Sequence, residues 1–269
     1  MIVPHLGRAL AAGLLALALL VAGCSSTPTK GEAPDATAEK LYREGRDELG
    51  SGAYERAIKL FERVEGLAAG TLLAQQAQLD MAYAQWRSNE RTAALATIDR
   101  FIKLNPSSPA LDYAMYLRGT INFNENLGLL GNLTGQRISE RDQRASRDAW
   151  QAYKQLVDQF PNSRYAPDAR LRMDFIANSL AEYELGVARY YFRRGAYLAA
   201  VNRAQQTVTE FPRSPSVEEA LALMVRGYDK LGLATLRDDA QRVLRRNFPR
   251  SAYLADAEGA ADKPWWRFW

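Results

Sequence analysis

A recurring four-residue phrase most constrains how this chain of 269 residues can fold. Each copy consists of Asn or Phe, then Pro, one further residue and Ser, and follows a stretch whose apolar residues recur at steps of three and four, as in an amphipathic helix. Proline lacks the N–H that a helix interior needs, so it ends one helix, and the serine is placed to cap the next. The copies are Asn105-Pro-Ser-Ser, Phe160-Pro-Asn-Ser, Phe211-Pro-Arg-Ser and Phe248-Pro-Arg-Ser. The chain is therefore expected to consist of helices joined in repeated units.

Small residues recur in pairs ahead of these prolines, where two helices would cross closely. The two members of each pair are 12 residues apart, as in Gly45 and Ala57, Ala82 and Ala94, and Ala188 and Ala200. The whole pattern recurs after about 34 residues and resembles the tetratricopeptide repeat, a helix-turn-helix unit that stacks on its neighbours. This resemblance covers roughly residues 38–250. It implies an all-α fold, a superhelical solenoid of about five helix pairs.

Departures from the repeat locate its irregular parts. Gly119 and Ala149 stand 30 residues apart instead of 12, which indicates an insertion of about 18 residues near 125–142. Pro161 and Pro212 are 51 residues apart, enough for an extra or lengthened helix at about 166–180. Smaller departures are Ala69 in place of the first closing proline, Ala204 and Thr207 in place of larger apolar residues, and Arg237 in place of a small residue in the last repeat.

The first 23 residues have the pattern of a secretory signal peptide, with Arg8 ahead of an apolar stretch. This stretch is about 14 residues long, shorter than the roughly 20 that cross a bilayer, which disfavours a retained membrane helix. It ends in Val21-Ala22-Gly23-Cys24, which resembles the lipobox of bacterial lipoproteins, and Cys24 is the only cysteine. The resemblance implies that Cys24 becomes the new N-terminus and carries diacylglycerol and an N-acyl chain.

Residues 24–37 are small, polar and broken by two prolines, so we expect a flexible lipidated tether between the membrane and the repeats. In lipoproteins of this kind an Asp directly after the Cys usually signals retention in the inner membrane. Here Ser25 follows the Cys. The resemblance therefore implies the periplasmic face of the outer membrane.

The order of signal peptide, lipobox, tether and irregular repeats resembles the BamD (ComL-type) family of lipoproteins of the outer-membrane β-barrel assembly (Bam) machinery. The phrases that carry the resemblance are Leu41-Tyr-Arg-Glu-Gly with Gly52-Ala-Tyr-Glu-Arg-Ala-Ile, Tyr113-Ala-Met-Tyr-Leu-Arg-Gly, and Ala188-Arg-Tyr-Tyr-Phe-Arg-Arg-Gly-Ala-Tyr-Leu-Ala-Ala-Val-Asn-Arg. The resemblance implies a scaffold in which residues 38–140 engage unfolded outer-membrane proteins and residues 141–250 bind the periplasmic domain of a BamA-like barrel subunit. It also implies contact with other Bam lipoproteins.

Aromatic residues point to a surface for the unfolded substrate. Stacked repeats leave a concave surface lined by the first helix of each pair. The repeat frame places aromatic side chains and one arginine there, which suits an extended, aromatic-ended peptide. The alternative is that these aromatic side chains pack between repeats. The candidate residues are Tyr42, Arg46, Tyr83, Trp86, Tyr113, Tyr116 and Phe123.

Arg203 lies on the expected second helix of the fourth repeat. The family has an arginine at this position that meets an acidic residue of the barrel subunit, so the resemblance implies a partner-binding role for Arg203. An arginine suits such a contact because its planar fork can bind a carboxylate through two N–H groups. A solvated surface arginine is the alternative.

Two segments leave their roles open. The insertion near 125–142 is rich in leucine and is either a contact loop or disordered. The tail, residues 251–269, ends in Pro264-Trp-Trp-Arg-Phe-Trp, and exposing three tryptophans freely is unfavourable. The aromatic end, Trp265 to Trp269, either folds back on the last repeat, binds a partner or contacts the membrane interface, where Trp is enriched.

Several chemistries are excluded by residue content. His5, the one histidine, lies in the signal peptide and Cys24 is expected to be acylated, which excludes histidine-dependent triads and zinc sites. Gly131 to Gly135 lacks the lysine of a phosphate-binding loop. No enzyme activity, metal or cofactor is expected, and a formal charge of +4 is too small to indicate nucleic-acid binding. The alternative function is a peptidoglycan-associated or envelope-maintenance repeat lipoprotein that recruits cell-wall enzymes.

Overall fold

The computed structural model describes residues 34–123 and 143–254, and the regular elements in these two stretches are helices. In order they are α2 (Pro34–Ser51), α3 (Tyr54–Leu67), α4 (Leu72–Arg87), α5 (Arg91–Leu104), α6 (Leu111–Asn122), α8 (Gln143–Gln159), α9 (Ala166–Arg193), α10 (Tyr197–Glu210), α11 (Ser216–Lys230) and α12 (Ala234–Asn247). Cys24, the insertion at 125–142 and the aromatic end Trp265 to Trp269 lie outside the described residues.

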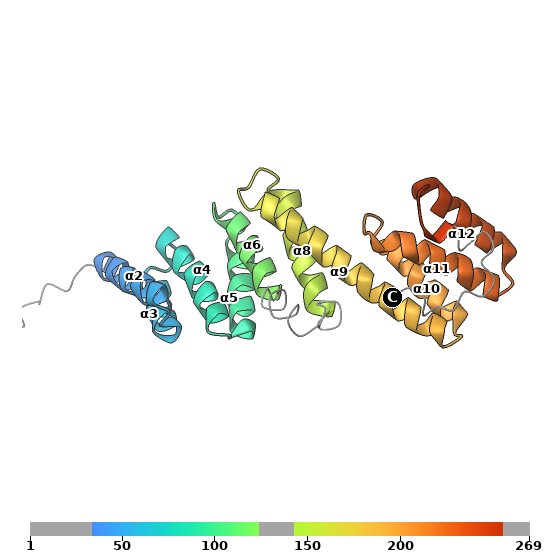
Figure 1. The fold of residues 1–269 in the computed structure, drawn as a ribbon. Helices are drawn as coiled ribbons and strands as arrows, with labels where there is room; N and C mark the ends of the chain where they lie inside the picture. Colours follow the sequence, from blue (N-terminus) through green and yellow to red (C-terminus); the bar gives the residue numbers. More distant parts are fainter. Residues whose placement is uncertain (1–33, 124–142, 255–269) are drawn as a thin grey trace, which may run out of the picture.

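The helices form five pairs in a row, from the blue end to the red end of Figure 1. Each helix packs mainly on its neighbours in the sequence, as a solenoid requires. The pairs are α2 with α3, α4 with α5, α6 with α8, α9 with α10, and α11 with α12. The predicted all-α solenoid of about five helix pairs is confirmed.

Helix α9 joins the N-terminal and C-terminal pairs. It has 28 residues and spans roughly 42 Å at 1.5 Å per residue, so the lengthened helix predicted at about 166–180 is part of it. It contacts α8 on one side and both α10 and α11 on the other, and Figure 1 shows it running diagonally between the two halves. The fourth pair is therefore joined to the third and to the fifth through this one long helix.

The small residues lie where helices cross closely, as predicted. A Cβ atom at Gly45 would lie 2.7 Å from Cε1 of Phe61, and one at Gly119 would lie 2.5 Å from Cε1 of Tyr153. Both aromatic side chains are fully buried. Each ring thus fills the space that its glycine leaves open, and the two crossings are equivalent once the insertion after α6 is allowed for.

The short turns inside the pairs share a feature that the sequence analysis missed. One residue in each adopts a positive φ: Gly52 (81°), Asn89 (69°), Gly195 (75°) and Gly232 (71°). The following amide donates back to the carbonyl five residues earlier, as from Ala53 to Glu48 at 2.9 Å, which is the Schellman ending of a helix. This ending stops the first helix of a pair and reverses the chain.

The serines of the recurring phrase close the turn before a helix, so their predicted role as helix caps is wrong. The Oγ atoms of Ser108 and Ser163 accept hydrogen bonds from the amides of Ala110 and Tyr165, at 3.3 and 3.2 Å. Helices α6 and α9 begin three residues after Ser108 and Ser163, because a further backbone turn comes between. Only the first junction, which lacks the proline, is capped directly: Thr71 Oγ1 accepts from the amide of Ala74 at 3.3 Å.

The first helix begins earlier than predicted. Helix α2 starts at Pro34, so the last four residues of the expected flexible tether are helical. Proline at the start of a helix is tolerated, since the first amides of a helix need no intrahelical acceptor. The proline that suggested a loop in the sequence therefore stands at a helix start.

Candidate protein-binding surfaces

Six of the seven predicted substrate-binding residues lie on the first helices of the first three pairs. Tyr42 and Arg46 are on α2, Tyr83 and Trp86 on α4, and Tyr113 and Tyr116 on α6. These three helices contact one another in sequence, so the residues belong to one side of the solenoid. Arg46 is exposed and the five aromatic side chains are half-buried. We call these six residues the aromatic face.

Phe123 does not belong to this face, so its predicted exposure is wrong. It is 8% exposed, packs in a core cluster with Leu111 and Tyr153, and its ring lies 5.8 Å from that of Phe175. The reason is local: the backbone leaves α6 at Phe123 in an extended conformation, with φ −87° and ψ 108°. The side chain is no longer in the helical register from which the prediction was made.

Asp80 connects α2 to α4 within the aromatic face. The Tyr42 hydroxyl donates to Oδ2 of Asp80 at 2.6 Å, and Nη1 of Arg46 donates to Oδ1 at 3.1 Å. Burial, followed by the hydrogen bond that Tyr42 donates to Asp80, raises the pKa of Tyr42. Burial and the charge of Asp80 likewise raise the pKa of Tyr113 to about 12. Asp80 does not stand out in the sequence, because a single acid in a helix has the appearance of a surface charge.

A second cation accompanies the aromatic residues of α4. The Tyr83 and Trp86 rings lie 5.6 Å apart, nearly edge to face. Nη1 of Arg87 donates to the Tyr83 hydroxyl at 2.9 Å, and its guanidinium lies over the Tyr54 ring at 5.3 Å. Such cation–aromatic contacts hold the rings in place at a partly exposed site.

The aromatic face continues onto the start of α9. The ring of Tyr165, which directly precedes α9, lies 5.4 Å from the Tyr113 ring and stacks on the Tyr116 ring at 4.9 Å. The Tyr116 hydroxyl also donates to Oδ2 of Asp168 at 2.6 Å. Tyr113 and Tyr116 therefore pack between the third and fourth pairs while remaining partly accessible. Tyr165 was missed because it lies in a turn, outside the helical repeat frame.

Arg203 is a partly exposed arginine that is paired within the protein. Its Nη1 donates to Oε2 of Glu184 on α9 at 2.9 Å and to Gln206 at 3.3 Å. The Glu184 side chain is 5% exposed and the Arg203 side chain is 42% exposed. Arg147, from α8, approaches Glu184 to 3.8 Å and Glu210 to 3.1 Å. Arg203 thus belongs to an ion-pair network that crosses three helices.

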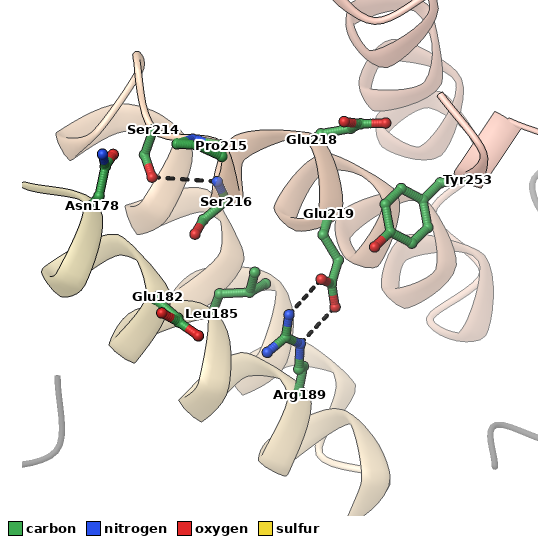
Figure 2. A pocket seen from close by; sticks show the side chains of 10 residues that line it. All are labelled: Asn178, Glu182, Leu185, Arg189, Ser214, Pro215, Ser216, Glu218, Glu219 and Tyr253. Carbon is green, nitrogen blue, oxygen red and sulfur yellow. Dashed lines mark hydrogen bonds and ion pairs between the residues drawn. The ribbon is translucent and has the colours of Figure 1, made fainter. Parts of the chain in front are cut away.

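A polar cavity of about 350 Å³ opens between α9 and α11, as Figure 2 shows. Glu219 accepts hydrogen bonds there from Nη2 of Arg189 and, at 2.6 Å, from Nε. Burial alone would raise the pKa of Glu219, but the hydrogen bonds and charge of Arg189 outweigh burial and lower it. The cavity wall is therefore a fixed ion pair. None of the predicted substrate-binding or partner-binding residues lines this cavity.

Within residues 34–123 and 143–254, no group of three or more His, Cys, Asp or Glu side chains is arranged to hold a metal ion. None of the helices described there combines the length and hydropathy that spanning a membrane requires.

Known proteins resemble this chain along most of its length. The family model described as YfiO, outer membrane lipoprotein, matches residues 34–244. The outer membrane protein assembly factor BamD of Neisseria meningitidis serogroup A is 44% identical over 259 residues, covering 95% of this chain and 97% of the relative. Its counterpart in Vibrio cholerae is 34% identical over 87% and 96% of the two chains. A solved tetratricopeptide repeat protein from Parabacteroides merdae aligns with a TM-score of 0.36 and 13% identity over 82% and 84%.

Proposed function

We propose, since this chain belongs to the YfiO family of outer membrane lipoproteins and to the BamD assembly factors, that it is a scaffold with two protein-binding surfaces. The aromatic face engages unfolded outer-membrane proteins. The region around Arg203 binds the periplasmic domain of a BamA-like barrel subunit. The chain is an assembly factor and not an enzyme. Its lipid anchor at Cys24 and contacts with other Bam lipoproteins complete the proposal.

The observation that carries this proposal is the separation of the two surfaces along one solenoid. The aromatic face lies on α2, α4 and α6, whereas Arg203 lies on α10, with α9 between them. A substrate and a barrel subunit can therefore bind at the same time without competing for residues. Stacked repeats keep two such surfaces at a fixed spacing, because each pair is packed on the next.

Co-purification tests this proposal against the peptidoglycan-associated alternative. The protein carrying a C-terminal tag would be isolated from mildly solubilised envelopes, and the proteins bound to it identified by mass spectrometry. We expect a large outer-membrane barrel protein with periplasmic domains to dominate. Recovery of peptidoglycan or its synthases in its place would leave the scaffold intact and refute the partner assignment.

Changing Tyr83 and Trp86 together to alanine is expected to weaken binding of a barrel-derived C-terminal peptide roughly tenfold to a hundredfold. The two ring centroids lie 5.6 Å apart, so the double change removes a pair of aromatic side chains that pack on each other before the peptide binds. Fluorescence anisotropy with a labelled peptide measures the dissociation constant. Tyr190→Ala is the matched control, because Tyr190 is a 49% exposed aromatic residue on α9, outside the aromatic face. Unchanged peptide affinity in a variant with native helicity would rule out this face.

A further inference from the structure

Asp80 and Glu184 are the only carboxylates that are buried within the described residues, at 8% and 4% exposure. Each holds one of the two arginines proposed to bind proteins. Asp80 accepts from Nη1 of Arg46 across α2 and α4, and Glu184 accepts from Nη1 of Arg203 across α9 and α10. The same arrangement therefore occurs once on each of the two proposed surfaces.

Stability alone gives little reason for this arrangement. Burying a carboxylate carries a large desolvation cost, and well-packed apolar residues often replace a buried ion pair without loss of stability. Glu184 nevertheless lies in the core side of α9, where its neighbours Leu185 and Ala188 are apolar and buried. The buried carboxylate is therefore better explained by a role in positioning the arginine that it binds.

The arginine forks are engaged at one end only. Arg46 and Arg203 keep 52% and 42% of their side chains exposed. Arg46 donates to Asp80, and Arg203 donates to Glu184 and Gln206, through Nη1, so Nε and Nη2 take no part in these bonds. A fork fixed at one nitrogen loses less conformational entropy when it binds a further carboxylate than a fully mobile arginine does.

We propose that Glu184 is a positioning residue, which fixes Arg203 so that its remaining N–H groups receive a carboxylate of the barrel subunit. Asp80 holds Arg46 in the same way on the aromatic face. Arg147 lies 3.8 Å from Glu184 and supplies a second cation, so Glu184 stays paired when Arg203 shares its charge with the partner. The inference rests on the proposed function of Arg203 and adds the residue through which that arginine acts.

A double-mutant cycle on the full mature chain tests Glu184. The probe is the purified periplasmic region of the barrel subunit, and the dissociation constant is measured for Glu184→Gln, Arg203→Ala and the double variant. Gln keeps the size of the side chain and one acceptor but removes the charge. We expect each single change to weaken binding roughly tenfold, and the double variant to bind no more weakly than Arg203→Ala. Glu210→Gln should leave the dissociation constant unchanged, because Glu210 contacts Arg147 and Gln206 but not Arg203.

The outcomes separate this inference from the proposed function. If Arg203→Ala weakens binding but Glu184→Gln does not, or if the two losses multiply in the double variant, Glu184 does not act through Arg203 and the inference fails alone. If Arg203→Ala binds normally, the partner contact and the inference both fail. Thermal melting is recorded for every variant. Should Glu184→Gln fail to fold, Glu184→Asp keeps the charge and shortens the anchor, and it must still weaken binding for the inference to stand.

Discussion

Replacing Cys24 with alanine is expected to remove the protein from the outer membrane almost completely. Each methylene buried by an acyl chain contributes about 0.8 kcal/mol, so an anchor of more than one chain outweighs weak surface contacts. The described helices offer no membrane-spanning segment in its place. Detergent phase partition of the purified protein measures the effect: the parent should enter the detergent phase, and the variant should stay in water.

The comparison needs two safeguards. The Cys24→Ala variant should carry the cleavable signal peptide of a soluble periplasmic protein, so that an uncleaved apolar stretch cannot act as an anchor. The parent keeps its own signal peptide. Ser25→Asp is the matched control, because it leaves Cys24 intact and should move the acylated protein to the inner membrane. A Cys24→Ala chain that still enters the detergent phase, or a parent chain without the mass of attached acyl groups, would contradict lipidation at Cys24.

The helix pairs were predictable because their signals are local. Gly45 and Gly119 marked helix crossings by their small size alone, and the proline phrases marked helix ends. Both signals reflect sterics that hold for any repeat of this kind. The long helix α9 was also predictable, because the 51 residues between Pro161 and Pro212 are more than one repeat needs. Repeat spacing thus determines most of this fold.

The proposed binding surfaces were predictable only in part, because they depend on contacts between distant residues. Arg203 and Glu184 are 19 positions apart and lie on different helices, and Asp80 meets Arg46 across 34 positions. No periodicity in one helix reveals such a partner. The prediction for Phe123 was wrong for a local reason. The backbone becomes extended at the end of α6, so Phe123 no longer follows the helical periodicity. Sequence placed the arginines, and the structure was needed to identify what holds them.

Arg203→Glu is expected to weaken binding of the barrel subunit by at least about a hundredfold. The substitution removes the fork that would meet the partner's carboxylate and puts a like charge there. It also places a second carboxylate beside buried Glu184, whose remaining cation, Arg147, is 3.8 Å away. Breaking a pair of this kind costs about 2–4 kcal/mol of folding free energy. Affinity and the free energy of unfolding must therefore be measured on the same preparation.

Two matched variants separate lost binding from lost stability. Arg147→Ala withdraws the other cation from Glu184 without touching Arg203, so it should reduce the free energy of unfolding and leave partner affinity nearly unchanged. Arg203→Lys keeps a charge for Glu184 but lacks the planar fork, so it should preserve stability and still weaken binding. If partner affinity followed the melting temperature across all three variants, Arg203 would be a structural residue of the α8, α9 and α10 junction. If affinity falls when the guanidinium is removed but does not follow stability, the ion-pair network of that junction positions Arg203 for partner binding.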